Sequence, residues 1–286
     1  MSVQNSTTAI HSSSTGHSCS DRGWLEIHFE AARPEYEAML QSVGIESGWR
    51  VLDAGCGGGS FLSLIAEAVG PTGHISALDL APENINRVKE RLIKGNFASN
   101  IETAIGSLTE LHYPDNNFDA IWCANVSQYL TDGELSTALT EFRRVVRPGG
   151  MVAVKESDLT SYRFYPSDPT LYWRALEAAR QAHTAIAGAL RATDLSAWLK
   201  QSGLSDVWQK TTVSEWCAPL RPVEREFIEP FFGYIANSAE QVGISEMDIE
   251  AWHNLKDLSA PDHILNRPDF YFREGNIVAV GRIPSD

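Results

Sequence analysis

The sequence predicts an α/β fold, in which a mostly parallel sheet of seven strands is covered by helices on both faces. Three observations lead to this prediction. Apolar stretches of strand length alternate with amphipathic stretches of helix length between residues 49 and 157, a glycine-dense turn joins the first such strand to its helix, and Pro or Gly residues mark most boundaries. This alternation is typical of parallel strands, because each crossover between them carries a helix.

The elements of this repeating part, and those just before it, can be assigned in order. Two helices are expected between Arg22 and Gly44, the second opened by Pro34, whose fixed φ suits the first turn of a helix. Five strands are predicted next, at 49–52, 74–80, 101–105, 118–124 and 151–155. Amphipathic helices are predicted between most of these strands, at 61–69, 82–94 and 133–146.

The pattern changes after residue 158. An alanine-rich helix is expected from Asp168 to about Leu190, and a shorter one from Asp194 to Gly203. The last two strands are predicted at 207–216 and 277–281. Between them, 222–258 is predicted to be helical, broken near Pro230 and restarting at Ser245.

These assignments predict one domain, residues 21–286, with helical insertions at about 159–193 and 219–274. Residues 1–20 are rich in Ser, Thr and His and contain neither an apolar core nor basic residues. That composition fits neither a signal peptide nor a transit peptide, and it favours a disordered tail.

The chain is acidic. It has 23 Lys and Arg residues against 37 Asp and Glu, a net charge of −14, and no run of basic residues. Nucleic acids and anionic membranes both favour a basic surface, so neither is expected as a main partner. No apolar stretch approaches the roughly 20 residues of a membrane span. The four cysteines are scattered without a CxxC pair, which predicts reduced thiols in a cytoplasmic protein and no metal site.

The most informative stretch is the turn after the first strand, which reads VLDAGCGGGSF at residues 51–61. Glycines allow positive φ and let a ligand approach the main chain with no Cβ in the way. The helix that follows offers unpaired N–H groups and the positive end of its dipole. A bare turn needs only one or two glycines, so four of them here indicate a ligand-binding turn.

Two classes of cofactor use such a turn. The dinucleotide fingerprint requires a third glycine or alanine where this chain has Ser60. Asp53, two positions before Gly55, would repel a pyrophosphate, whereas it would attract a cationic ligand. A nicotinamide-dependent oxidoreductase stays as the alternative interpretation.

The same stretch closely resembles motif I of the class I S-adenosylmethionine (SAM)-dependent methyltransferases. SAM carries a sulfonium, an ammonium and a carboxylate, and no phosphate. The resemblance implies a Rossmann-like cofactor half at about residues 44–157 and an N-terminal lid at residues 21–43. It also implies that SAM is the cofactor, bound by Asp53 and by the backbone at Gly55, Gly57 and Gly59.

Two further stretches match this family in order. An acidic residue at the end of the second strand binds the ribose in the family, and here Asp79 stands at that place, followed by Leu80. Residues 105–108 resemble the adenine-binding region. Many relatives have Asp where this chain has Ser107, whose hydroxyl accepts a hydrogen bond more weakly, while the Leu108 N–H can still donate.

Residues 125–129 resemble the segment that borders the methionine half of SAM and its methyl group in these enzymes. The resemblance therefore implies cofactor contacts for Asn125, Val126 and Gln128, and simple turn positions are the alternative for Asn125 and Gln128. Together the landmarks lie between residues 50 and 157, and they specify the cofactor and not the acceptor.

Methyl transfer from a sulfonium is an in-line displacement, which mainly requires alignment of the reacting atoms and exclusion of water. A hydroxyl acceptor, or a carbon that must lose a proton afterwards, also benefits from a base. The candidate bases near the expected sheet edge are His28, Glu156, Asp158 and His183. Solvated or packed positions are the alternative for each.

The expected insertions are rich in large aromatic side chains. The family builds its acceptor pocket there, so the resemblance implies an acceptor cap for a small apolar molecule, aromatic or isoprenoid, in specialised metabolism. Methylation of carbon or oxygen is favoured, and methylation of nitrogen is left open. The alternatives are a quinone or lipid acceptor, a SAM-binding protein without transferase activity, and aromatic residues that only fill a core or a homo-oligomer interface.

Overall fold

The computed structural model describes residues 11–12, 18–19, 22–95, 97, 100–182 and 185–285. Most of the expected tail at residues 1–20 therefore lies outside the described residues; within it, β1 (His11–Ser12) pairs antiparallel with β2 (Ser18–Cys19). The chain divides into two compact units. The first, which we call the sheet unit, contains Pro34–Asp158, Gly188–Thr212 and Gly275–Asp286. The second, the aromatic unit, contains Met1–Arg33, Leu159–Ala187 and Val213–Glu274.

The predicted α/β fold with seven strands is confirmed. The sheet has the strand order β5-β4-β3-β6-β7-β9-β8, and the pairs β5–β4, β4–β3, β3–β6 and β6–β7 are parallel. The chain order reverses next to β3, as in doubly wound sheets that bind ligands at the carboxyl ends of their strands. The strand bounds are β3 Arg50–Ala54, β4 His74–Asp79, β5 Asn100–Ile105, β6 Phe118–Ala124, β7 Val146–Tyr165, β8 Ser205–Cys217 and β9 Tyr271–Arg282.

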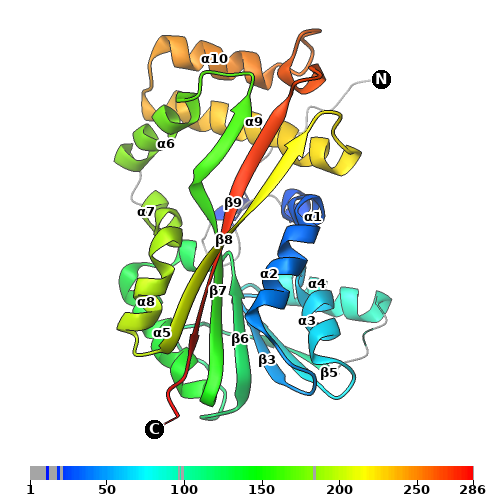
Figure 1. Cartoon of the computed structure of the whole chain (residues 1–286), viewed down its shortest axis with the longest axis vertical. Helices are drawn as coiled ribbons and strands as arrows, with labels where there is room; N and C mark the ends of the chain where they lie inside the picture. The colour runs from blue at the N-terminus through cyan, green and yellow to red at the C-terminus, as the bar shows by residue number, and fades with distance from the viewer. Residues whose placement is uncertain are drawn as a thin grey trace. The chain divides into compact units, whose positions relative to one another are not determined.

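Helices cover both faces of the parallel strands (Figure 1). α3 (Leu62–Val69) contacts β3 and β4, and α4 (Pro82–Lys94) contacts β4 and β5. α5 (Asp132–Val145) and α8 (Leu195–Gln201) share a hydrophobic cluster with the other face. α5 begins with a capping box, in which Thr131 and Glu134 satisfy each other's backbone N–H groups.

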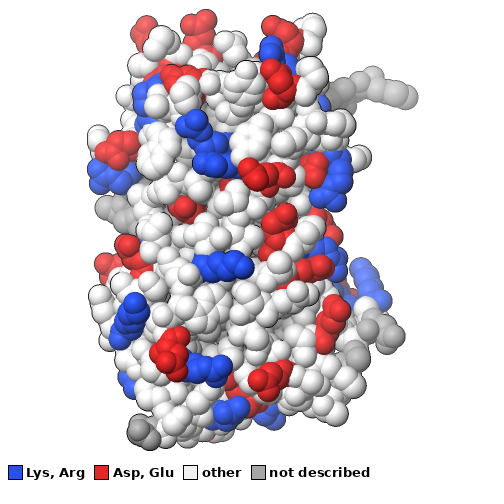
Figure 2. Space-filling view, viewed as in Figure 1, with Lys and Arg blue, Asp and Glu red and all other residues white. Residues whose placement is uncertain are grey.

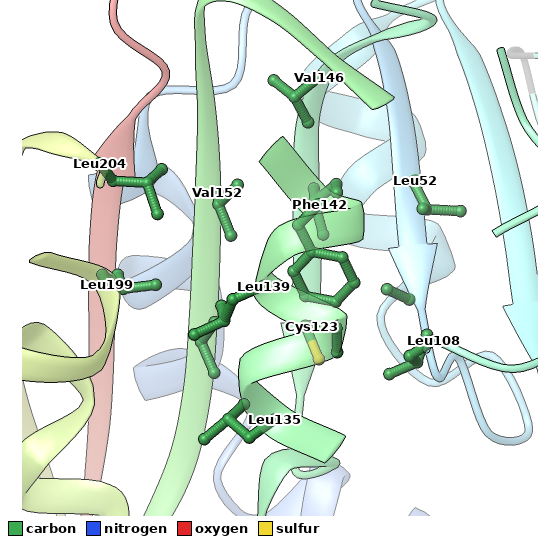
Figure 3. Close-up of a cluster of buried hydrophobic side chains, with 14 of the residues drawn as sticks. Leu52, Leu108, Cys123, Leu135, Leu139, Phe142, Val146, Val152, Leu199 and Leu204 are labelled. Carbon is green, nitrogen blue, oxygen red and sulfur yellow. The ribbon is translucent and has the colours of Figure 1, made fainter. Parts of the chain in front are cut away.

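The cluster under α5 and α8 joins strands to helices in one core (Figure 3). Successive residues of a strand point to opposite faces, so Leu52, Cys123 and Val152 pack here while their neighbours face α3. From α5, Leu135, Leu139 and Phe142 fill the space between them. By the same alternation, Asp53 on β3 and Lys155 on β7 point to the opposite face.

The aromatic unit is built around its own core of rings. Its helices include α1 (Arg22–Ala31), α6 (Leu171–Ala182), α9 (Pro222–Val242) and α10 (Glu246–Lys256), and α9 contacts each of the other three. Most of the aromatic residues expected in the insertions are buried and packed on one another, namely Tyr162, Phe164, Tyr172, Trp216, Phe227, Phe231, Phe232 and Trp252. These rings therefore form a hydrophobic core, whereas Tyr165, Trp173 and Tyr234 of the insertions are well exposed.

Several element boundaries differ from the predicted ones. The break expected near Pro230 is wrong, because α9 continues through Pro230 to Val242 and ends at the left-handed Gly243. Burial of Phe227, Phe231 and Phe232 around the proline outweighs its unfavourable helix propensity of about 3 kcal/mol. β7 and β9 are longer than predicted, and each has residues in both units. α2 (Arg33–Val43) also has residues in both units, so the expected lid at residues 21–43 is divided between the two units. Within the expected alanine-rich helix, the described residues form α6 and α7 (Ala185–Leu190).

Acidic and basic side chains are interspersed over the face drawn in Figure 2, and acidic residues are in excess in the sequence. None of the helices in the described residues is long and apolar enough to cross a membrane.

We expect Phe142→Ala to destabilise the sheet unit by about 3–5 kcal/mol, because a fully buried ring of the cluster would be replaced by a cavity. Urea unfolding followed by circular dichroism measures the change. Ser136→Ala on the exposed face of the same helix is the control, and its midpoint should stay at that of the unmutated protein.

Candidate functional site

The glycine turn follows β3 and leads into α3. Gly55, Gly57 and Gly59 have φ of 77°, 53° and 80°, a region in which side chains with a Cβ are strained. The Gly55 N–H donates to the Leu78 carbonyl at 2.8 Å, and a Cβ at Gly55 would lie 2.5 Å from the Val126 side chain. At Gly57, by contrast, nothing lies within 4 Å of where a Cβ would be, so a ligand can approach this part of the backbone.

Asp79, at the end of β4, holds this turn in place. Its Oδ2 accepts from the Gly57 N–H at 2.8 Å, and its Oδ1 accepts from the Ala81 N–H at 2.9 Å and from Asn84 Nδ2 at 3.0 Å. A carboxylate has about four acceptor positions, and three are used within the chain. About one acceptor position of Asp79 therefore remains for the predicted hydrogen bond to the ribose.

Asp53 lies on the neighbouring strand and is in a very different state. The residue is 2% exposed, and its Oδ2 has no hydrogen-bond partner among the described residues. Burial, together with the nearby charge of Asp79, raises the pKa of Asp53 to about 8. The thiols of Cys56 and Cys123 also lie near, and burial raises the pKa of both, so they add no charge at neutral pH.

The chemistry of this donor set fits SAM. An unpaired buried carboxylate gains from a cationic ligand, since the ionised form is then no longer alone in a region of low dielectric constant. A dinucleotide would place negative phosphates against the same group. Asp53, with the open backbone at Gly57, would hold a positively charged part of SAM. Among the described residues, no cluster of His, Cys, Asp or Glu side chains could hold a metal ion.

The loop after β6 forms a second side of the site. Asn125 has a φ of 59°, its N–H donates to the Lys155 carbonyl at 2.7 Å, and its Oδ1 accepts from Lys155 Nζ at 2.8 Å. Lys155 is fully buried, with Nζ 4.5 Å from the centroid of the Tyr36 ring. Sequence reasoning missed Lys155, although a lysine ending the apolar strand predicted at 151–155 is an unusual residue for a buried position.

Gln128 and Ser127 are tied to Glu156, one of the expected bases. Glu156 Oε1 accepts from Ser127 Oγ at 2.8 Å and from the Gln128 N–H at 3.3 Å, and Gln128 Nε2 donates to the Asn125 carbonyl at 3.2 Å. Glu156 is 2% exposed, and burial raises its pKa above the usual value, against the lowering effect of the Ser127 hydrogen bond.

The stretch expected to bind adenine borders a small pocket of about 90 Å³. Ser107 lies on its wall, and the Ser107 hydroxyl is hydrogen-bonded to Thr109 Oγ1 at 2.8 Å. The Leu108 side chain is packed in the hydrophobic cluster, so only its backbone could reach a ligand. Leu80 is 46% exposed, which is unusual for a leucine next to a buried strand and leaves it available to pack on an apolar surface.

The remaining candidate bases are His28, Asp158 and His183. His28 belongs to the aromatic unit, where it is stacked on Phe227 and its Nε2 lies 2.7 Å from Glu274 Oε1. Asp158 is half-buried at the last position of one segment of the sheet unit. His183 lies outside the described residues. Glu156 is therefore the candidate base that the structure groups with the expected cofactor residues.

Comparison with known families decides what the glycine turn belongs to. Residues 51–150, from the middle of β3 into β7, match the model of a family described as a methyltransferase domain. The chain carries a class I SAM-dependent methyltransferase domain. This confirms the family and the cofactor expected from motif I, and the dinucleotide interpretation of the turn is set aside.

Similar proteins agree with this assignment. The methyltransferase domain is similar to a demethylmenaquinone methyltransferase of Geobacillus kaustophilus (strain HTA426), with 33% identity over 140 residues, 48% of this chain and 53% of that protein. The chain spans little more than half the length of the curated relatives it matches.

Solved structures share the fold. A protein from Bacillus halodurans C-125 that is assigned as a methyltransferase has a TM-score of 0.54 and 15% identity, over 86% of this chain and 97% of that one. Haemonchus contortus phosphoethanolamine N-methyltransferase 2, whose structure contains S-adenosylhomocysteine, has a TM-score of 0.52 and 15% identity, over 92% of this chain and 57% of that one.

We expect the affinity for SAM to depend on the ionisation of Asp53. Below about pH 8 this carboxyl group is protonated in the ligand-free protein, so binding of the cation through its carboxylate releases a proton. The affinity contributed by Asp53 should rise by up to about tenfold per pH unit from about pH 6 to 8 and then level off. Calorimetry in buffers of different ionisation enthalpy measures both the affinity and the proton released.

Asp53→Asn separates this effect from titration of the ligand's own amino group, because only the latter remains in the variant. The variant should bind SAM more weakly and release about one proton fewer. It should also have a higher Tm than the unmutated protein at pH 8. A carboxyl whose folded-state pKa is raised loses stability as pH rises from about 4 to 8, and Asn removes that loss. Equal affinities across this pH range would contradict the assigned role.

Proposed function

We propose that the protein transfers a methyl group from SAM to a small apolar or aromatic acceptor. The observation that carries the proposal is the buried carboxyl group of Asp53, whose Oδ2 has no hydrogen-bond partner among the described residues, beside the open backbone of the glycine turn. The match of residues 51–150 to a methyltransferase domain supports it. The negative net charge supports a small molecule over a nucleic acid as the partner. We also propose that the protein is cytoplasmic and forms a homo-oligomer.

The described residues supply what this transfer requires of a protein. When bound, SAM provides a methyl group on a positively charged sulfur, and transfer neutralises that sulfur. Asp53 would stabilise the positive charge of the bound donor, and the Asn125 and Gln128 loop would border its reactive end. Lys155 donates to the Asn125 side chain, and the buried Tyr36 ring packs against Lys155 and Phe61. Such packing would help to keep water from the reacting groups, as the transfer requires.

Fewer observations support the proposed acceptor than support SAM as the donor. The aromatic rings of the insertions mostly fill the core of the aromatic unit, so their abundance alone is weaker support for an aromatic acceptor than the sequence suggested. The similarity to demethylmenaquinone methyltransferases favours a second candidate within the same class, a quinone-type acceptor that joins an aromatic ring to an isoprenoid chain. Specialised metabolism is the other context for such a ring.

A hydroxyl or hydroquinone acceptor would use a base, and His28 is the candidate that its contacts support best. Its Nε2 lies 2.7 Å from Glu274, which is fully buried and also accepts from Tyr162 OH at 2.9 Å. A buried carboxylate beside a histidine orients the imidazole ring, as a general base requires. His183 stays a proposal from sequence alone.

With methyl-labelled SAM, we expect transfer of label to hydroquinones or phenols and formation of S-adenosylhomocysteine. The panel should pair each ring with and without an isoprenoid chain, and include indoles and a primary amine. Preference for the prenylated hydroquinone would support the quinone candidate, whereas preference for the unsubstituted ring would support an acceptor of specialised metabolism. Binding of NAD in place of SAM would refute the proposed function.

His28→Asn should lower kcat by about 100-fold for a hydroxyl acceptor, the range expected for loss of a general base, and leave the Kd for SAM within about twofold. His253→Asn is the matched control, since that exposed histidine also pairs with a glutamate in the aromatic unit. If both variants kept the kcat of the unmutated protein, His28 would be a packing residue and the proposed base would be wrong.

A further inference from the structure

The loop Asn125–Leu130, which we call the methyl-side loop, is held by two buried charged residues of opposite sign. Glu156, in β7, accepts from the loop's donors, Ser127 Oγ and the Gln128 N–H. Arg191, in the short helix Arg191–Asp194, donates to the loop's acceptors, with Nη2 2.7 Å from the Ser127 carbonyl and hydrogen-bonded also to the Leu130 carbonyl. Both residues are less than a tenth exposed.

The two charges meet on one residue. Ser127 is 1% exposed, its hydroxyl donates to Glu156, and its carbonyl accepts from Arg191. Hydrogen bonds to charged groups are stronger than neutral ones, and two of opposite polarity on one residue fix both its side chain and its peptide plane. The position of the following residue, Gln128, is determined by the same pair.

The guanidinium of Arg191 is itself held on several sides. Nη1 pairs with Asp132 at the start of α5, and the group lies over the Trp198 ring at 5.8 Å from its centroid. Because a guanidinium is planar with five donors in a fixed geometry, the directions in which it bonds two carbonyls and a carboxylate are fixed, whereas the three donors of an ammonium rotate freely. This favours a role in fixing geometry over simple charge.

Gly188 brings this segment close to the loop. A Cβ at Gly188 would lie 2.3 Å from the Gln128 carbonyl oxygen, a distance that forces the backbone apart. The requirement for glycine is therefore set by the methyl-side loop and not by the local conformation of α7. All of these contacts lie within the sheet unit.

We propose that Glu156 and Arg191 are positioning residues, which fix the methyl-side loop so that Asn125 and Gln128 contact the reactive end of SAM. The inference rests on the proposed function. It gives Glu156 a role different from the base considered from sequence, because Oε1 of Glu156 already accepts two hydrogen bonds from the loop itself. No proton transfer is required of it.

Substitutions at Glu156 separate the two roles. Glu156→Gln keeps an oxygen that can accept from Ser127 and Gln128, so it should retain kcat within about fivefold, whereas Glu156→Ala should lose about 100-fold through misplacement of the loop. If Glu156 were a base, both variants would lose turnover equally, because Gln cannot take up the proton of the methyl acceptor. Equal loss in the two variants would therefore overturn the positioning role of Glu156.

Substitutions at Arg191 and Gly188 test the other side of the loop through the Kd for SAM and S-adenosylhomocysteine, measured by calorimetry. Arg191→Met and Gly188→Ala should each raise both Kd values by about tenfold or more, with Arg191→Lys intermediate. The controls are Arg143→Met, which removes an exposed arginine from the Ser202 carbonyl, and Gly133→Ala, where a Cβ meets no atom within 4 Å. Both controls should keep the Kd of the unmutated protein.

Thermal unfolding of each variant shows whether a loss reflects the loop or the fold. If Arg191→Met fails to fold, Arg191→Lys and Gly188→Ala carry the test. Folded Arg191 and Gly188 variants with unchanged Kd and kcat would overturn the inference. If the unmutated protein binds SAM but methylates no acceptor, the proposed function fails while raised Kd values in these variants still support the loop's role; no SAM binding by the unmutated protein refutes both.

Discussion

The candidate site depends on the electrostatic state of one carboxyl group. Asp53 is buried at the end of a central strand with an unpartnered oxygen and a second carboxylate nearby. An ionised group in that position is unfavourable until a positive charge arrives, so the ligand-free protein retains a proton there near neutral pH. A site built in this way favours a cation and disfavours phosphate, which agrees with the methyltransferase family of residues 51–150.

Three acidic residues of the sheet, Asp79 on β4, Glu156 on β7 and Asp53 on β3, have different states because their partners differ. Asp79 accepts three hydrogen bonds and holds the glycine turn, and Glu156 accepts two from the methyl-side loop. Oδ2 of Asp53 accepts none from the described residues. Hydrogen bonds stabilise a buried carboxylate, so the first two can organise backbone while the third stays available for a ligand. Structural and ligand-binding roles are thus separated among side chains of the same chemistry.

The aromatic unit has its own polar centre within a hydrophobic core. Glu274 is fully buried and is bonded by His28 and Tyr162, which come from elements far apart in the chain. Apolar residues would fill such a core at lower cost, since burial of a carboxylate requires several compensating hydrogen bonds. This is the physical reason for attributing a chemical role to His28, and it stands independently of the number of aromatic residues around it.

Much of the fold and of the cofactor site was predictable from sequence because it depends on local pattern. Strands β4 and β6, helix α4 and the cap of α10 by Ser245 lie within a residue of their predicted positions, since periodicity, proline and capping residues act over a few residues. The glycine turn and Asp53 were recognisable for the same reason. Their chemistry is written in one continuous stretch of eleven residues.

Tertiary structure alone decided the rest. Lys155 beside Asn125 and Tyr36, Arg191 on the carbonyls of the methyl-side loop, and Glu274 beside His28 join residues that are 30 to 246 positions apart, and no local pattern marks such pairs. Pro230 continues a helix because the rings packed around it outweigh its own preference. The sequence by itself determined the fold class and the donor that the site accepts, because both follow from contiguous residues. Which carboxylate stays unpaired, and which side chains hold the loop around the reacting group, was decided only by packing at long range.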